Sequence, residues 1–342
     1  MSALTLSVPA RTAALRFTPL RAVGLLGTLA VLAVFTILLS ALLGEYPVHL
    51  VEALRDSRSA DGTVLWGLRL PRALLGALVG ASLAASGSAL QALLRNPLAD
   101  PFVLGVSGGA ALGATLALAL GLQAVAGPSL FAFAGAVGAM ALVLAAGRAR
   151  SSSYAALLTG VVFNAFAAAV ITCIKTLLTP DRVGEILYWL AGTLGYERPR
   201  TLLVSGALQL VALGVLWAQS GRLNLLTLGD DEASSLGVPV RRTRAIVLLA
   251  ASLSVAGAVA LTGLIGFVGL IVPHVLRLWL GPDQRLLVPA SALGGAAFLV
   301  LSDLLTRLLF PLFHAEPPVG VVTAVLGGPL FVWLLHRREA TA

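Results

Sequence analysis

Long apolar runs recur along this 342-residue chain, and they constrain its fold more than any motif does. The first occupies residues 22–43 and the last residues 319–335, each close to the ~20 residues with which a helix crosses a bilayer. Apolar and polar residues do not alternate within them, as they do in the strands of a membrane β-barrel. With 58% hydrophobic and 11% charged residues, the chain is far too apolar for a soluble domain. The sequence therefore predicts an all-α, polytopic membrane protein.

Charged and proline-containing corners divide the chain into ten predicted spans, which we expect to form one transmembrane domain over residues 1–342. Ten spans put both termini on one side, and the larger share of the 23 lysines and arginines falls on that side. Because cytoplasmic loops carry the excess of basic residues, we expect residues 1–21 to form a cytoplasmic tail. Residues 180–195 are predicted to hold a short helix that either lies at the membrane interface or re-enters the membrane. The spans are expected at residues 22–43, 70–94, 102–120, 127–147, 154–178, 201–219, 245–261, 264–280, 286–305 and 319–335.

Few residues in the chain are of the kinds that hold metals or carry bond chemistry. The single cysteine, Cys173, and the four histidines are scattered without the spacing of metal ligands. The only lysine, Lys175, does not belong to a phosphate-binding loop, so ATP hydrolysis that drives this protein must occur in another subunit. The basic residues lie in separate corners, which argues against a nucleic-acid partner. The sequence predicts no cofactor, no metal site and no enzymatic activity.

The corner at residues 95–101 carries strong signals for helix ends. Pro97 ends the second span, Asp100 can cap the next helix through its side chain, and Pro101 suits the first helical position. We expect a capped turn on the cytoplasmic side. Small residues recur at three- or four-residue spacing in the spans on both sides, which predicts close packing of helices. They are Gly76, Gly80, Ala84 and Gly87 before the corner, and Gly105, Gly109 and Gly113 after it.

Residues 220–244 are the longest polar stretch between the later spans, and they contain a short predicted helix. Asp230, Asp231 and Glu232 fill its first turn, where the helix dipole favours negative charge. Gly237 stands where a helix-terminating glycine is expected. The helix is either an ordinary solvated loop element or a docking element on the cytoplasmic face.

Arg69, Arg72 and Arg307 lie at the non-cytoplasmic ends of predicted spans. Arg307 follows Asp303 by four residues, so the two side chains can pair on one face of a helix. One interpretation is that the three arginines extend to the membrane interface. The other is that they present positive charge to an acidic partner outside the cell membrane.

Two functions of other classes are open from these residues. Residues 105–108 fit the GxSG pattern of intramembrane serine proteases, with Ser107 as nucleophile and His274 as base. Against this, Val275 follows His274, where such a dyad packs against a small residue. A stand-alone secondary transporter would need ionisable groups inside its spans. Asp303 is the one carboxylate well inside a predicted span, and we expect it to pair with Arg307.

Several long motifs closely resemble, in order, those of the FecCD family, the permease subunits of type II ABC importers for iron-siderophores, haem and cobalamin. The resemblance covers nearly the whole chain. The motifs are RLPR at 69–72, GASLAASGSALQALLRNPLADPFVLG at 80–105, GLIGFVGLIVPHVLR ending at Arg277, GPDQRLLVPASALGGAAFLVLSDLLTR at 281–307 and EPPVGVVTAVLGGPLF at 316–331.

The resemblance implies a permease of ten spans that pairs with a second copy or a close relative in the inner (cytoplasmic) membrane. Two ABC ATPase subunits would bind inside, and a periplasmic or lipid-anchored substrate-binding protein would dock outside. ATP binding and hydrolysis in the partner would drive alternating access. The expected substrate is an iron-siderophore, with haem and cobalamin as the alternatives.

The resemblance also assigns roles to individual residues. The binding protein would dock on Arg69, Arg72 and Arg307. The ATPase would contact Leu228, Gly229, Asp230, Asp231, Glu232, Ala233, Leu236 and Gly237, within a coupling region at 220–244. Ser151, Ser152, Ser153, Tyr154 and Asn164 would belong to the gate and pathway, although Tyr154 is bulkier than the small polar residue that the family's gate implies.

Overall fold

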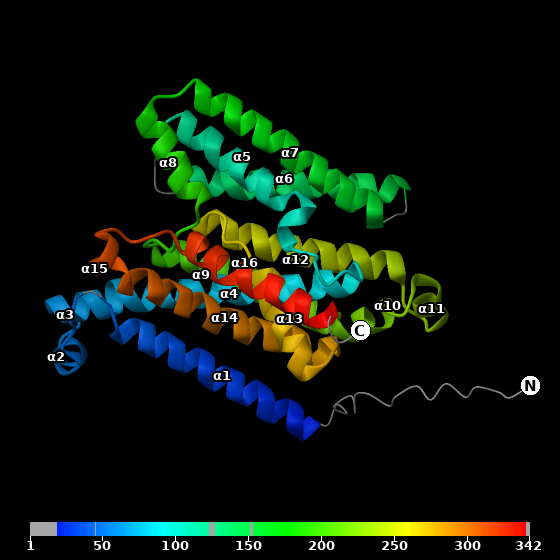
Figure 1. The fold of residues 1–342 in the computed structure, drawn as a ribbon, viewed down its shortest axis with the longest axis horizontal. Helices are drawn as coiled ribbons and strands as arrows, with labels where there is room; N and C mark the ends of the chain where they lie inside the picture. The colour runs from blue at the N-terminus through cyan, green and yellow to red at the C-terminus, as the bar shows by residue number, and fades with distance from the viewer. Residues whose placement is uncertain (1–18, 45, 123–126, 151–152, 340–342) are drawn as a thin grey trace, which may run out of the picture.

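The computed structural model describes residues 19–44, 46–122, 127–150 and 153–339, and every regular element within them is a helix (Figure 1). The predicted all-α fold is confirmed. In this part of the chain, seven helices are long and apolar enough to cross a membrane. Residues 106–119, 268–280 and 319–333 form shorter apolar helices, so the number of ten spans stays a prediction.

The long helices follow the predicted apolar runs closely. They are α1 (Pro19–Leu42), α4 (Leu70–Leu93), α5 (Val106–Ala119), α6 (Gly127–Arg150), α7 (Ser153–Thr176), α9 (Pro199–Ala218), α12 (Val240–Thr262), α13 (Val268–Leu280), α14 (Gln284–Leu308) and α16 (Val319–Glu339). The short helix predicted after the fifth span is confirmed as α8 (Pro180–Leu190).

The helix of the second span begins earlier than predicted. α3 (Ala60–Gly62) continues through the π-helical η1 (Thr63–Arg69) into α4, so the helical run has 34 residues. At the end of η1, the N–H of Leu70 bonds to the carbonyl of Leu65, five residues back. This wider turn precedes Pro71, which lacks an N–H and would crowd the carbonyl four residues earlier in an ordinary α-helix. Arg69 and Arg72 therefore lie inside a continuous helix.

The span predicted at 264–280 is helical only from Val268. Before it, Gly263 and Phe267 both have positive φ, at 69° and 70°, which a continuing α-helix does not allow. The segment also turns beside the chain after α8, where the N–H of Thr193 donates to the carbonyl of Thr262 at 2.8 Å. Residues 264–267 are as apolar as the helix that follows, so hydropathy alone could not show that the chain turns there. The predicted start of this span at residue 264 was therefore wrong.

α4 lies at the centre of the bundle because its small residues let neighbouring backbones approach. It packs against α1, α9, α12, α13 and α14. A Cβ on Gly80 would lie 2.2 Å from the carbonyl oxygen of Gly295, and one on Gly87 would lie 1.8 Å from that of Gly269. Real side chains do not fit at such distances, so the predicted packing role of these glycines is confirmed.

The long helices lie roughly parallel or antiparallel to one another, so the molecule has two ends at which they start and finish (Figure 1). α2 (Leu50–Arg55), α3 and α15 (Phe310–Phe313) lie at one end, which we name the α15 end. α10 (Ser220–Leu226) and α11 (Asp230–Ser235) lie at the other, which we name the α11 end. The start of α1 and the end of α16 also lie there, as an even number of spans requires. α12 joins the group of α5, α6 and α7 to the group around α4.

Candidate functional site

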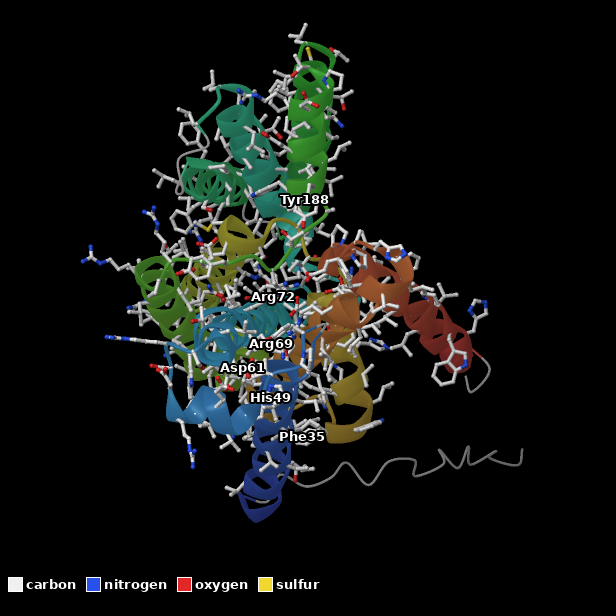
Figure 2. All side chains as sticks on the ribbon, turned by 90° about the vertical axis from the view of Figure 1, so that its left-hand side faces the viewer. Phe35, His49, Asp61, Arg69, Arg72 and Tyr188 are labelled. Carbon is white, nitrogen blue, oxygen red and sulfur yellow. The ribbon has the colours of Figure 1, made fainter. Side chains whose placement is uncertain are left out.

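At the α15 end, the side chain of Arg72 on α4 binds two carboxylates. Its Nε and Nη2 donate to Asp303 on α14 at 3.0 and 2.9 Å, and Nη2 also donates to Glu316 at 2.8 Å. Asp303 is buried, whereas Glu316 is partly exposed in the segment between α15 and α16. Figure 2 looks onto this end and shows Arg72 and Arg69 near its middle. Arg72 thus ties three segments together and keeps one exposed edge, since its side chain is 23% exposed.

Arg69 and Arg307 lie beneath the surface and cap the end of α1. Arg69 donates to the carbonyls of Leu42, at 2.9 Å, and of Tyr46. Arg307 donates to the carbonyl of Ser40 at 3.0 Å and to the Ser40 hydroxyl. These carbonyls belong to the last turn of α1 and the chain after it, where intrahelical donors are lacking. The arginines are 7% and 6% exposed, so neither extends to the interface as one interpretation supposed.

The pair that the sequence predicted between Arg307 and Asp303 is confirmed, with Nε 3.4 Å from Oδ2. Asp303 therefore forms ion pairs with both Arg72 and Arg307. A buried carboxylate requires such compensation, because an unpaired charge in this position would be costly. The docking role of the three arginines stays a prediction.

At the α11 end, Asp230 connects the short helix α11 to two long helices. Its Oδ1 accepts from Arg95, in the corner after α4, and from Arg244 on α12 at 2.7 Å. The Nε of Arg95 also donates to the carbonyl of Leu226, at 2.9 Å, in the last turn of α10. The sequence predicted the acidic helix and the arginine corner separately. It gave no sign that they touch, because 135 residues separate Arg95 from Asp230.

The corner around Arg95 closes α4 in an unusual way. The N–H of Asn96 bonds to the carbonyl of Gln91, and Arg95 has a positive φ of 50°. This is the helix-ending motif in which glycine is normally preferred. Its link to α10 and α11 offsets the cost of that backbone conformation.

Asp100 caps a helix, as predicted, by accepting from the N–H of Phe102 at 2.7 Å. That helix is the separate 3₁₀-helix η2 (Pro101–Leu104), which ends at Gly105 with φ at 81°, and α5 begins only at Val106, so the third span does not start at residue 102 as predicted. Burial raises the pKa of the Asp100 carboxyl, and this hydrogen bond opposes the rise. Pro101 occupies the first position of η2, also as predicted.

α11 has the predicted ends and a divided surface. It starts at Asp230, and Gly237 ends it with φ at 82° while the N–H of Val238 bonds to the carbonyl of Ala233. Ala233 and Gly229 are buried, whereas Asp231, Glu232 and Gly237 are exposed. The large apolar side chains of Leu228 and Leu236 are 63% and 59% exposed. An apolar pair flanked by acids is thus open to a partner at this end.

α10 is held to the start of α14. Asn224 donates through Nδ2 to Asp283 at 2.6 Å, and its Oδ1 accepts from the N–H of Gln284 at 2.8 Å. Asp283 caps α14 by accepting from the N–H of Arg285. Side-chain bonds therefore hold α10 and α11 to α12, to the start of α14 and to the corner that follows α4.

The predicted gate residues are only partly described. Ser151 and Ser152 lie outside the described residues, and so do the side chains of Ser153 and Tyr154 at the start of α7. Asn164 joins α7 to the chain around η2: its Oδ1 accepts from the N–H of Gly108, and its Nδ2 donates to the carbonyl of Phe102, both at 3.0 Å. The structure gives Asn164 a structural contact that the sequence did not predict.

The residues of the protease hypothesis occupy separate environments. The hydroxyl of Ser107 donates to the carbonyl of Phe102 at 3.1 Å. His274 is buried on α13, with its ring 5.8 Å from that of Phe331 in an edge-on arrangement. Within the part of the chain that the structure describes, no group of three or more His, Cys, Asp or Glu residues is arranged to hold a metal ion.

The sequence and structure of the chain were compared with those of known proteins. The model of the FecCD transport family matches residues 32–337. A hemin transport system permease of Yersinia pestis is 39% identical over 324 residues, which is 92% of this chain and 96% of the relative. A cobalamin import permease of Halobacterium salinarum is 45% identical over 279 residues, 80% of this chain and 74% of the relative.

An iron chelatin transport permease of Helicobacter pylori (strain 26695) is 39% identical over 285 residues, 83% of this chain and 86% of the relative. A solved structure of a metal-chelate-type ABC transporter in an inward-facing conformation matches with a TM-score of 0.81 and 32% identity, over 92% of this chain and 99% of that one. The chain belongs to the FecCD family of ABC importer permeases.

Proposed function

We propose that this permease carries an iron-siderophore-type chelate inward across the cytoplasmic membrane. Its membership of a transport permease family makes it the membrane subunit of a type II importer, with no enzymatic activity of its own. The relatives' names include hemin, cobalamin and iron chelatin, so the choice of substrate is the proposal. It rests on the metal-chelate-type structural neighbour. It rests also on the resemblance to the family, in which iron-siderophore transport is the commonest role.

The α15 end faces outward in this proposal and receives a substrate-binding protein. The net charge of the Arg69, Arg72, Asp303, Arg307 and Glu316 cluster is positive, which suits an acidic partner. Because Arg69 and Arg307 are almost fully buried, the partner's carboxylates meet the exposed edge of Arg72 first. The two buried arginines act by fixing α1 against α4 and α14.

The α11 end faces the cytoplasm and receives the ATPase. Exposed Leu228 and Leu236 supply the apolar contact, and Asp231 and Glu232 supply the polar rim. Ala233 and Gly229 face the permease itself. With this orientation both termini are cytoplasmic, and residues 1–342 form one transmembrane domain.

Two permease copies enclose the pathway, and α7 with Asn164 lines it. A long apolar stretch of α7 supports this assignment: most of the residues from Leu158 to Thr176 are not buried within one chain, which leaves a surface for a second copy or for lipid. The gate at residues 151–154 is part of the same proposal.

The substrate is tested in the host, where the native ATPase and binding protein are present. Deleting the chain should abolish uptake of an ⁵⁵Fe-labelled siderophore and leave uptake of haem and labelled cobalamin unchanged. Complementation with the intact chain is the control. Loss of haem or cobalamin uptake alone would reassign the cargo, and unchanged uptake of all three would refute the proposal.

A further inference from the structure

A groove on the outer surface of the helix bundle lies between α6, α9 and α12. Its volume is about 410 Å³. The groove joins the two helix groups of Figure 1, because α6 belongs to the α5–α7 group and α12 packs against α4. Its apolar walls are formed mainly by Leu130, Phe133, Val204, Leu208 and Leu261.

The charge of the groove lies at one end, because Ser205, further along the wall, is neutral and its hydroxyl donates to the carbonyl of Gly257 at 3.2 Å. Arg200 lies in the first turn of α9 and Ser129 in the first turn of α6, and both line the groove. α12 runs the opposite way and contributes residues from its last turns, including Leu261, so the helix ends meet at this mouth. From Arg200, the wall continues along α9 to Leu208, about 12 Å further at 1.5 Å per residue. The groove therefore has a charged head and an apolar body.

Arg200 is exposed, and among the described residues no carboxylate lies within ion-pair distance of it. Arg198, two residues earlier, is also exposed without an ion pair in this part of the chain. Guanidinium groups bind phosphate with two parallel hydrogen bonds. The mouth of the groove thus offers uncompensated positive charge to an anion.

We propose that this groove binds an anionic phospholipid, with its phosphate on Arg200 and one acyl chain between α6, α9 and α12. The walls point to lipid because they belong to helices that are long enough to span a membrane, and Val204 is 73% exposed on the same face. Gly257 and Ala260 have small side chains, so they leave room on the α12 side of the groove for an acyl chain. The lipid would fasten the α5–α7 group to the rest of the bundle.

The headgroup contact is tested on the purified full-length permease. It is incubated in mild detergent with equal amounts of phosphatidylglycerol and phosphatidylethanolamine, and bound lipid is counted by native mass spectrometry. Wild type should retain phosphatidylglycerol preferentially. Arg200→Gln should reduce that retention about tenfold, the size expected for one charge-assisted contact. Arg58→Gln, an exposed arginine outside the groove, is the matched control and should retain the lipid as wild type does.

The acyl-chain contact is tested with a variant that fills the groove. Val204→Trp should abolish retention of both lipids, whereas Val211→Trp, on the same helix but outside the groove, should not. Equal retention by Arg200→Gln and Arg58→Gln would overturn the proposal, and so would equal retention by the two tryptophan variants. Dissociation of a permease dimer by Val204→Trp alone would assign the groove to a second copy and overturn it as well.

Discussion

At the scale of single residues, Glu316 determines how much of Arg72 is available to a partner. The two side chains form an ion pair at 2.8 Å, and Glu316 lies at the surface with 38% of its side chain exposed. A docking carboxylate would have to replace it. Glu316 is thus an internal competitor for the partner's acidic side chains, if Arg72 has the proposed role.

Neutralising this competitor should strengthen docking. Glu316→Gln should lower the half-saturating concentration of the importer's own loaded binding protein two- to fivefold, the range expected for a partly exposed ion pair. Arg72→Gln should raise it. Uptake into proteoliposomes that contain the complete importer measures both. Glu52→Gln, an exposed acid on α2 at the same end, is the control. No change in Arg72→Gln would contradict the docking role, and no change in Glu316→Gln would contradict only the competition.

The buried arginines should matter for stability. Arg307→Met removes the donors to the Ser40 carbonyl and hydroxyl and leaves Asp303 with Arg72 alone. Asp303 is therefore not left uncompensated, and the loss is that of hydrogen bonds from a charged group, about 1.5–3 kcal/mol. The thermal unfolding midpoint of the purified permease in detergent should therefore fall. Arg58→Met, which removes an exposed arginine at the same end, should leave it unchanged. Equal midpoints for the two variants would show that the cap on α1 is not needed.

At this scale the sequence predicted what helix geometry determines. Arg307 and Asp303 are four residues apart on one helix, so their pairing could be inferred directly. The bond from Arg307 to Ser40 crosses 267 residues and depends on how α1 packs, which no local pattern encodes. The burial of Arg69 was missed for a related reason: the helix of the second span starts at Ala60, not at Leu70.

At the scale of helices, glycines determine how closely α4 can be approached. Gly87→Ala would place a methyl group 1.8 Å from the carbonyl oxygen of Gly269, so α4 and α13 would have to separate. Overpacking of this kind costs about 1–3 kcal/mol or more. We expect a lower unfolding midpoint and reduced uptake. Gly138→Ala on α6 is the matched control, because nothing lies within 4 Å of its added Cβ. An unfolding midpoint equal to that of wild type for Gly87→Ala would show that α4 and α13 can move apart at this contact without loss of stability.

The sequence predicted the end of a helix correctly where the capping residue bonds only to the backbone near it. Asp100 and Gly237 each do so through a bond to the backbone a few residues away. The end of α4 was predicted at Pro97 but not in its form, because Arg95 takes the place that glycine usually holds. Asp230 helps to hold Arg95 in that conformation, but it lies 135 residues away, and rules for helix caps consider only residues near the helix end.

At the scale of the whole molecule, one helix connects the two proposed partner sites. The run from Ala60 to Leu93 carries Arg69 and Arg72 at the α15 end, and Arg95 follows directly at the α11 end. Hydropathy and charge predicted the two ends and their opposite sides. They did not predict that α11 is fastened to this helix, and that contact gives a route by which movement of α11 reaches α4.

The link between Arg95 and Asp230 should therefore matter for coupling more than for folding. Arg95→Gln and Asp230→Asn should each lower the unfolding midpoint only slightly, because the pair is partly exposed, and leave the basal ATPase rate of the assembled importer unchanged. Each should lower the amount of substrate taken up per ATP hydrolysed, by two- to fivefold for a partly exposed pair. Arg95 acts on α11 through its bond to Asp230, whereas Asp230→Asn also removes the bond to Arg244, so the double variant should be no worse than Asp230→Asn alone. Proteoliposomes that report uptake and phosphate release together measure this ratio.

Asp231→Asn provides the control, because it removes the same charge from the same turn of α11 without touching the bond to Arg95. It should leave the ratio of uptake to hydrolysis unchanged at saturating ATPase subunit, although it would weaken assembly if Asp231 contacts the ATPase. An equal loss of coupling in Asp231→Asn would assign the effect to the charge of α11. Additive losses in Arg95→Gln and Asp230→Asn would show that the two residues act separately, and that α4 is not moved through this bond.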